Sequence, residues 1–105
     1  MAVEEKEDSG EAVEALEGVE AAAQRYYAVA PGTTLNVRSG PGTHYRPVRV
    51  LPQGATVPIF CQRPGETVSG PYGTTKIWDN IGVGEYVSDA YVKTGSDGYV
   101  APRCA

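Results

Sequence analysis

The side chains that could perform nucleophilic chemistry are few and widely spaced in this sequence. The chain holds one histidine, His44, and two cysteines, Cys61 and Cys104. Cys–His catalysis would need a free thiolate beside the imidazole, and a serine hydrolase would need a Gly-x-Ser-x-Gly turn, which the sequence lacks. His44 lies in a glycine-rich stretch, where we expect a solvated loop residue. Nucleophilic catalysis is therefore not predicted.

Acid–base hydrolysis of a glycoside requires two carboxyl groups that flank the scissile bond. Beyond the first 25 residues, the candidates for such a pair are Asp79, Glu85 and Asp89. We interpret Asp89 as the cap of a short 3₁₀ turn and Glu85 as a solvated charge in a turn. The chain is accordingly predicted not to be an enzyme.

The sequence also lacks the spacings that bind metals or nucleotides. The two cysteines lie too far apart for a zinc site, and a single histidine adds no convincing ligand. Gly82-x-Gly84 lacks the third glycine and the following helix of a nucleotide-binding loop. Asp97-Gly98 lacks the acidic spacing of a calcium loop. We predict no metal and no cofactor.

Cys61 and Cys104 are interpreted first as a disulfide. Closing a loop of about forty residues would stabilise the fold by about 4 kcal/mol through the entropy of the unfolded chain. Such a bridge persists in an oxidising compartment, so we expect a secreted or cell-wall-associated protein. The alternative is a pair of buried free thiols.

Charge divides the chain into two parts. Residues 1–25 contain eight acidic and two basic residues and carry −6, whereas residues 26–105 contain five acidic and seven basic residues and carry +2. We predict an acidic leader over 1–25, disordered or weakly helical, and a folded module over 26–105. The leader is either a solvated linker or a mask for the basic face of the module.

The folded module is predicted to be all-β. The 13 glycines and eight prolines of the whole chain, 11 and eight of which lie in this module, indicate many turns between short strands. Leu35, Val37 and Ser39 alternate with polar residues, which is the period of a strand with one buried face, and Gly-Pro-Gly at 40–42 ends it. A return strand follows at 47–51. No run of eighteen apolar residues occurs, so no membrane span is predicted.

The remaining expected elements follow in chain order. A strand is predicted over residues 55–62, where Pro58 indicates an edge or bulge. Residues 63–75 are rich in Gly, Pro, Ser and Thr and are interpreted as a long exposed loop. Strands are expected at 76–81 and from 85 onward, on either side of a Gly-Val-Gly turn, and a last strand at 99–104.

Two separated blocks resemble the bacterial SH3-type (SH3b) domain. They are Leu-Asn-Val-Arg-Ser-Gly-Pro at 35–41, with a later Pro-x-Gly turn, and the Trp78 strand, whose glycine turn leads to Ser-Asp-Ala-Tyr-Val at 88–92. The resemblance covers residues 33–93. It implies a small SH3-like barrel of five to seven short strands, in which the Trp and Tyr-Val strands form a hairpin followed by a 3₁₀ turn at 88–91.

The chain departs from the minimal SH3b pattern in two places, the 63–75 loop and the extension over 94–105. We interpret the extension as the segment that returns Cys104 to Cys61. Disulfide-closed forms of this kind resemble those of secreted actinobacterial proteins.

The resemblance implies that the module binds cell-wall peptidoglycan, through its stem peptides or cross-bridges, in a groove beside the long arch. Aromatic faces would contact the ligand, and Arg38 would bind a peptide carboxylate. Mapped onto this sequence, the groove is lined by Asn36, Arg38, Tyr45, Tyr72, Trp78 and Tyr86.

Structural alternatives stand beside these assignments. Trp78 and Tyr86 are equally well explained as half-buried cross-strand partners, and Tyr91 as a core residue. Arg38 has an alternative as a structural partner of Asp79 or Asp89.

Two other functions remain open: a protein–protein interaction module, and a secreted inhibitor or signal protein that acts through the 63–75 loop. Proline-rich ligands are disfavoured because the arch over 39–46 has no acidic residue. We expect no nucleic-acid partner.

Overall fold

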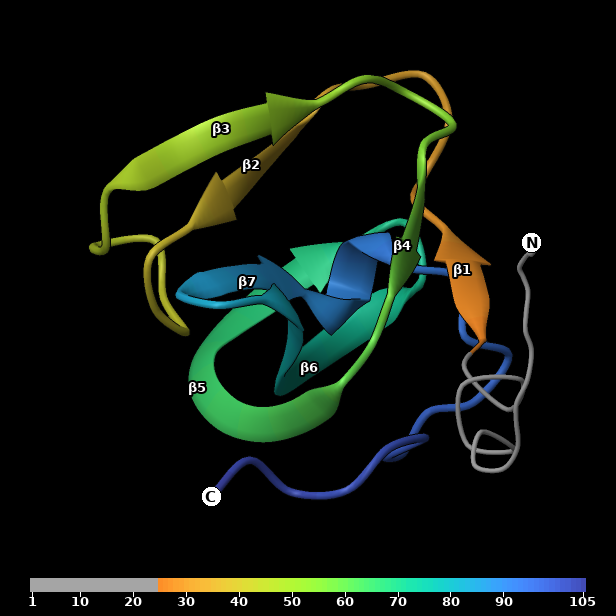
Figure 1. The fold of residues 1–105 in the computed structure, drawn as a ribbon. Helices are drawn as coiled ribbons and strands as arrows, with labels where there is room; N and C mark the ends of the chain where they lie inside the picture. Colours follow the sequence, from red (N-terminus) through yellow and green to blue (C-terminus); the bar gives the residue numbers. More distant parts are fainter. Residues whose placement is uncertain (1–24) are drawn as a thin grey trace, which may run out of the picture.

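The computed structural model describes residues 25–105, which form seven β-strands and one short 3₁₀ helix (Figure 1). The predictions of an all-β fold and of a 3₁₀ turn are confirmed, and the number of strands is within the predicted five to seven, although two of the strands span ten residues rather than being short. The acidic leader predicted over 1–25 lies, up to residue 24, outside the described residues. In chain order the elements are β1 (Tyr26–Ala28), β2 (Leu35–Arg38), β3 (Pro47–Leu51), β4 (Thr56–Pro58), β5 (Cys61–Gly70), β6 (Gly73–Gly82), β7 (Glu85–Ser88) and η2 (Asp89–Tyr91).

The strands form two antiparallel sheets. The larger sheet has the order β3-β2-β7-β6-β5, and the smaller one pairs β1 with β4. Strands β3 and β5 are the edges of the larger sheet, so its hydrogen bonding does not close on itself. The strand order establishes an antiparallel β-fold but not the closed barrel that the family resemblance implies.

The two predicted hairpins are present, and their geometry follows from the sequence pattern. Strands β2 and β3 pair with Leu35 opposite Leu51, and a bulge follows Val37, which is fully buried. Strands β6 and β7 pair with Trp78 opposite Ser88, and Gly84 adopts a φ of 65° in the turn. A left-handed backbone at that turn favours glycine, which explains why the Gly-Val-Gly signal marked it correctly.

The exposed loop predicted over 63–75 is wrong. These residues continue β5 to Gly70 and begin β6 at Gly73, so they form the distal half of a long hairpin. The pairing shifts register between Pro64 and Val68, and β5 curves strongly there (Figure 1). Proline and glycine mark a bulge inside the strand and a turn at its tip, because an edge strand tolerates both.

Two predicted strands also differ from the structure. The strand expected over 55–62 is split, because β4 ends at Pro58 in the small sheet and Cys61 begins β5 in the large one. Residues 99–104 make only an isolated parallel bridge, in which Arg103 lies opposite Gln62. Two backbone bonds hold this segment to β5, from Gln62 N to Pro102 O (2.8 Å) and from Cys104 N to Gln62 O (3.0 Å).

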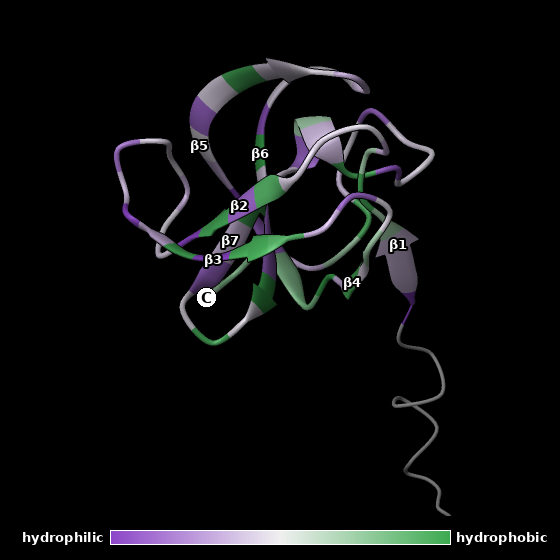
Figure 2. Cartoon of the chain, turned by 90° about the horizontal axis from the view of Figure 1, so that it is seen from above, coloured by the Kyte–Doolittle hydropathy of each residue, from purple (hydrophilic) through white to green (hydrophobic). Residues whose placement is uncertain are grey.

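The hydrophobic core lies between the two sheets and consists mainly of β-branched residues. Figure 2 shows hydrophobic segments on β2, β3, β4 and β6, strands that belong to both sheets. Burying each such side chain contributes about 1.5–3 kcal/mol, so the short strands depend on this shared cluster. Its buried members are Val29, Val37, Leu51, Val57, Ile59, Ile81, Val87 and Val92.

The predicted disulfide is present. Cys61 and Cys104 are bonded to each other across a sequence separation of 43 residues, which fixes the C-terminal segment to the start of β5. Among residues 25–105, no helix is long and apolar enough to cross a membrane.

Candidate functional site

The loop between β2 and β3, residues 39–46, forms an arch that is closed by its own hydrogen bonds. Ser39 N donates to Arg46 O at 3.1 Å across the base of the arch. Arg38 Nη1 donates to the carbonyl oxygens of Thr43 and Tyr45, both at 3.0 Å. Arg38 therefore braces the arch from inside, and the alternative that it pairs with Asp79 or Asp89 is wrong.

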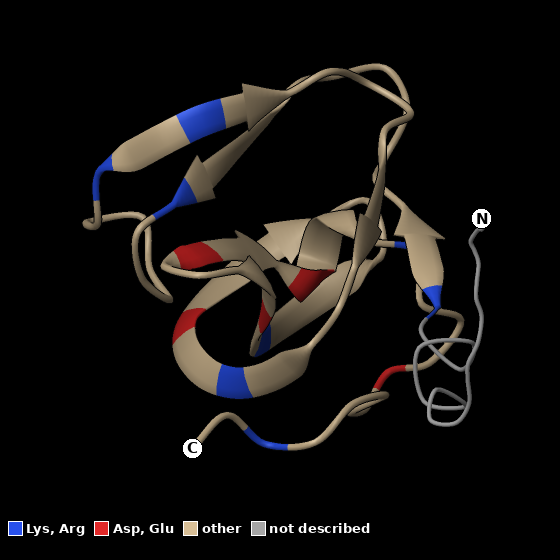
Figure 3. Ribbon diagram, in the orientation of Figure 1, with Lys and Arg blue, Asp and Glu red and all other residues tan. Residues whose placement is uncertain are grey.

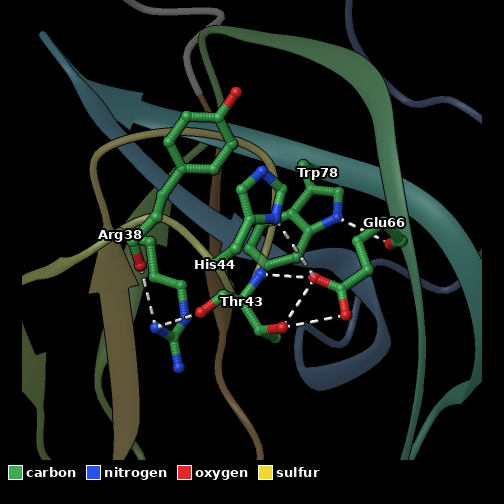
Figure 4. A network of polar contacts seen from close by, with 6 residues as sticks. Arg38, Thr43, His44, Glu66 and Trp78 are labelled. Atoms are coloured by element: carbon green, nitrogen blue, oxygen red, sulfur yellow. Dashed lines mark hydrogen bonds and ion pairs between the residues drawn. The ribbon is translucent and has the colours of Figure 1, made fainter.

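Glu66, on the curved part of β5, attaches the arch to the long hairpin (Figure 4). Its carboxylate accepts hydrogen bonds from Thr43 N (2.5 Å) and from Thr43 Oγ1 (2.6 and 2.8 Å). His44 Nδ1 lies 3.9 Å from the same carboxylate. The bonds from Thr43 lower the pKa of Glu66 below its ordinary value, so the carboxylate stays ionised in mildly acidic solution.

The backbones of the arch and the hairpin also touch directly. Glu66 N donates to Pro41 O at 3.1 Å, and Trp78 Nε1 donates to Glu66 O at 2.9 Å. A Cβ atom on Gly65 would lie 2.1 Å from Pro41 O, so only glycine permits this approach. The arch is thereby held in one position against β5 and β6.

A cavity of about 240 Å³, which we call the arch cavity, opens beside this contact. Apolar groups from Leu35, Val68 and Trp78 share its wall with polar groups from Asn36, Ser88 and other residues. The Asn36 side chain is exposed and makes no hydrogen bond to another described residue, so its amide is available to a ligand. The lining comprises Thr33, Thr34, Leu35, Asn36, Arg38, Thr43, Val68, Trp78, Ser88 and Tyr91.

Three of the six residues predicted for the ligand groove line this cavity: Asn36, Arg38 and Trp78. Trp78 is only 2% exposed, however, so it forms part of the wall and offers little contact surface. It is more deeply buried than the half-buried strand partner considered as its alternative.

The other three predicted residues lie elsewhere. Tyr45 is exposed on the arch and packs against the ring of His44, with 4.4 Å between the ring centroids. Tyr86 is half-buried on β7, opposite Arg38 of β2. Tyr72 lies at the tip of the β5–β6 hairpin and lines a second cavity.

Tyr91, which we expected in the core, is half-buried and lines the arch cavity. A Cβ atom on Gly70 would come within 2.9 Å of the Tyr91 ring, so the ring packs against the hairpin. Thr33, Thr34, Val68 and Ser88 were also missed. They belong to segments far apart in the sequence, and their proximity depends on the long hairpin that the sequence pattern did not reveal.

Apart from the contacts around Glu66, the described residues contain a pair of buried carboxyl groups. Asp79 is 0% exposed and Asp89 is 6% exposed. Asp79 Oδ1 accepts a hydrogen bond from Gln62 Nε2 at 2.6 Å, whereas Asp79 Oδ2 and Asp89 Oδ1 find no donor among the described residues. Burial, with Asp89 beside it, raises the pKa of Asp79 to about 9, and burial also raises the pKa of Asp89.

The sequence-based interpretations of Asp89 and Glu85 are both wrong. Ser88, not Asp89, caps η2, since its side-chain oxygen accepts from Ala90 N at 3.2 Å. Glu85 is not a solvated turn charge, because it forms a two-point ion pair with Arg49 at 2.9 and 3.1 Å. That pair joins β7 to β3, and in Figure 3 basic residues lie on β2 and β3 while acidic residues mark β7 and η2.

Gln62 connects the carboxyl pair to the C-terminal segment. Its Oε1 accepts hydrogen bonds from Val100 N (2.7 Å) and Ala101 N (2.9 Å), while its Nε2 donates to Asp79. The side chain is 0% exposed, so each of these bonds is made away from water. The segment that follows η2 is thus fixed by a buried amide as well as by the disulfide.

A larger cavity of about 600 Å³, the hairpin cavity, lies between the hairpin tip and the segment after η2. Within residues 25–105, no group of three or more His, Cys, Asp or Glu side chains could hold a metal ion. The lining comprises Tyr72, Gly73, Thr74, Thr75, Asp89, Val92, Lys93, Thr94, Gly95, Ser96 and Asp97.

Sequence comparison finds relatives in one bacterium. The chain is 44% identical over 95 residues to the uncharacterized protein YraI of Bacillus subtilis (strain 168), covering 81% of this chain and 80% of that protein. It is 45% identical over 96 residues to the uncharacterized protein YraJ of the same strain, with the same coverage of 81% and 80%. No protein-family model matches the chain.

Proposed function

The chain belongs to the family of the Bacillus subtilis proteins YraI and YraJ, and we propose that its module is an SH3b-like barrel that binds peptidoglycan stem peptides without catalysis. The ligand occupies the arch cavity. The module acts outside the cytoplasm, where the Cys61–Cys104 disulfide persists.

The barrel assignment is supported by the sequence blocks and by the path of the strands. The 3₁₀ turn η2 directly follows the β6–β7 hairpin, in the order that the SH3b resemblance implies. Strand β5 curves round the end of the larger sheet, and the small β1–β4 sheet covers part of the same core (Figure 1).

The observation that carries the binding proposal is the arch cavity beside a fixed arch. Ligand pockets are usually largely formed before binding and combine apolar walls with a few polar groups. At about 240 Å³ this cavity is small and accommodates one or two peptide residues. Arg38 uses Nη1 for its hydrogen bonds to the carbonyl oxygens of the arch, and its remaining N–H groups are suited to bind a peptide carboxylate.

The proposal contains no chemical step. Both cysteines are joined in the disulfide, and His44 lies beside Glu66 and Tyr45 rather than among the residues that line the arch cavity. A Cys–His or His-assisted mechanism would require these groups at the ligand.

The test is co-sedimentation of the oxidised full-length protein with purified Bacillus subtilis sacculi. We expect saturable pelleting that weakens about tenfold in Asn36→Ala, since a hydrogen bond to a charged or well-oriented partner contributes on that scale. Tyr72→Ala, which alters only the hairpin cavity, is the matched control and should pellet like the wild type. Trp78→Ala is unsuitable, because truncating a buried tryptophan costs about 3–5 kcal/mol of stability.

Two results would contradict this function. The absence of pelleting would exclude this wall as the ligand, and equal pelleting of Asn36→Ala would place binding outside the arch cavity. Saturable binding to a purified protein without wall affinity would instead support an interaction module or inhibitor. Its contact would then be sought at the hairpin tip, where Tyr72 is 38% exposed.

A further inference from the structure

Three arginines surround the arch cavity. Among the described residues that line the cavity, only Arg38 is charged. Arg46 lies at the base of the arch, where its carbonyl oxygen accepts from Ser39 N, and its side chain is exposed. Arg63 is exposed on β5 opposite Trp78, so both side chains lie on the same face of the sheet. We call the surface formed by these three arginines and the mouth of the cavity the arch face.

The acidic residues of the folded module leave this charge largely uncompensated. Two of them are bonded to neighbouring side chains, two are buried and one lines the hairpin cavity: Glu66 and Glu85, Asp79 and Asp89, and Asp97. The ion pairs among residues 25–105 are His44–Glu66 and Arg49–Glu85, and neither includes an arginine of the arch face. With Glu66 as the one carboxylate beside it, the arch face keeps a surplus of positive charge.

The acidic leader, residues 1–25, has the complementary charge and the length to reach the arch face. It carries −6, and its eight acidic residues fall between positions 4 and 20. It is joined to the module directly before β1. At up to about 3.4 Å per residue, the stretch from residue 5 to residue 25 can extend to about 68 Å. The described residues fit within 43 Å, so no part of the module is out of reach.

The arch face also offers apolar contacts that match the leader. Val13, Leu16 and Val19 each directly precede a glutamate. Val50 of β3 is 54% exposed and lies opposite Asn36, which places it on the face that bears the cavity. Because ion pairs between exposed groups contribute little by themselves, apolar burial beside them strengthens such a contact.

We propose that the acidic leader binds the arch face of its own module and occupies the position of an anionic ligand. Its carboxylates bond to the three arginines, and its apolar residues lie against Val50. Because leader and module belong to one chain, the concentration of the leader at the arch is on the order of millimolar. The consequence, competition with a stem-peptide carboxylate for Arg38, rests on the proposed function, whereas the contact itself does not.

The test compares ¹⁵N–¹H spectra of the oxidised full-length protein and a leader variant that keeps the length and apolar residues of the leader but loses four charges. The variant carries the substitutions Glu11→Gln, Glu14→Gln, Glu17→Gln and Glu20→Gln. At low ionic strength we expect the two spectra to differ at Asn36, Arg46, Val50 and Arg63, and to agree at Tyr72 of the hairpin tip. In about 1 M NaCl, where the Debye length is about 3 Å, the differences should disappear.

Substitutions on the module identify the cations involved. In Arg46→Gln, the salt-dependent shift of the Asn36 amide should roughly halve, since one of three ion-pair partners is lost. Lys93→Gln is the matched control, because Lys93 is an exposed cation that lines the hairpin cavity instead. Its spectrum should respond to salt at Asn36 as the wild type does.

The consequence for binding is measured by pelleting with sacculi. We expect the leader variant to bind roughly two- to tenfold more tightly than the wild type, because a tethered competitor at millimolar concentration has been weakened. Equal pelleting of the two proteins, with the contact visible in the spectra, would overturn the competition.

Other results would overturn the contact itself. Spectra that agree outside the leader at low ionic strength would show that the leader is a solvated linker. Shift differences that weaken on tenfold dilution would assign the leader to the arch face of a second copy. Pelleting by neither protein would contradict wall binding instead, and the spectra would still decide whether the leader contacts the arch face.

Discussion

The buried residues Asp79 and Asp89 make the stability of the fold depend on pH. Burial and the neighbouring carboxyl group raise the pKa of Asp79 from 3.8 to about 9, so the folded protein holds a proton that the unfolded chain releases. Between these two values the native state binds more protons than the unfolded state. The free energy of unfolding must therefore fall as pH rises through this range.

Replacing Asp89 with asparagine should reduce this pH dependence without removing it, because burial, the larger cause of the raised pKa of Asp79, remains. The amide can donate to Asp79, so the remaining carboxylate no longer faces a like charge. In the wild type we expect the free energy of unfolding to fall by up to about 4 kcal/mol from pH 5 to pH 8, and in Asp89→Asn by clearly less. Guanidinium denaturation at the two pH values measures the change in the free energy of unfolding for each protein. An identical change in both would mean that Asp89 does not raise the pKa of Asp79.

Glu66 is the second residue with a specific expected effect. In Glu66→Gln, an uncharged oxygen replaces the carboxylate that accepts from Thr43, and neutral hydrogen bonds are roughly half as strong. Hydrogen exchange at the Thr43 amide should accelerate several-fold. Because the pKa of Glu66 is lowered, wild-type protection should persist in mild acid and fade only below the ordinary value of 4.5.

Glu85→Gln is the control for this measurement. It breaks the ion pair with Arg49 but leaves the arch untouched, so Thr43 exchange should not change. Equal acceleration in both variants would mean that Glu66 acts through general stability rather than by holding the arch.

At the residue scale, sequence patterns predicted which side chains share a face of a strand better than they predicted which residues those side chains contact. Asn36 and Arg38, which the family resemblance mapped to a groove beside the arch, both line the arch cavity, and strand alternation puts them on the same face of β2. The burial of Asp79 was not foreseen. Three successive residues of β6, Ile77 to Asp79, are buried. Strand alternation alone would bury only every second residue. Both faces of β6 are covered, which depends on the curvature of β5.

At the scale of elements, the contact between the arch and the hairpin depends on one residue without a side chain. A Cβ atom on Gly65 would meet Pro41 O at 2.1 Å, so Gly65→Ala must displace the arch or the curved part of β5. We expect a loss of about 1–3 kcal/mol in the free energy of unfolding, the usual cost of overpacking.

Gly98→Ala is the matched control, since the nearest atom to its Cβ would lie 4.0 Å away. Its stability should stay within about 0.5 kcal/mol of the wild type, as for most surface substitutions. Chemical denaturation of both variants checks the comparison. If the two substitutions were equally costly, the close approach of Gly65 to Pro41 would not determine the position of the arch.

The elements that the sequence predicted correctly are those with local signals. The β6–β7 hairpin has a glycine turn, and β2 alternates and then stops at Gly-Pro-Gly. The β5–β6 hairpin was missed because Pro64 and Gly65 occur where the strand bulges rather than where it ends. Distinguishing a bulge from a loop requires knowledge of the partner strand, and that information is not local.

For the molecule as a whole, the disulfide and Gln62 hold the C-terminal segment that forms one wall of the hairpin cavity. A double Cys61→Ser, Cys104→Ser variant should lose about 4 kcal/mol of unfolding free energy, as expected for closing a loop of 43 residues. Guanidinium denaturation of the oxidised protein and the variant measures this difference. A loss below about 1 kcal/mol would indicate that Gln62 and the core hold the segment without the bridge.

Under a pulling force, the disulfide separates the module into a stretch that cannot be extended and a stretch that can. Pulling on residues 25 and 105 cannot extend the 43-residue stretch between the cysteines, because the covalent bond carries the force. At about 3.4 Å per residue, this withholds roughly 145 Å of chain from stretching. Every residue that lines the hairpin cavity lies within the protected stretch, whereas the arch and its cavity depend on residues 33–43, which lie outside it. Tension between two attached bodies would therefore dismantle the arch cavity first and spare the hairpin cavity.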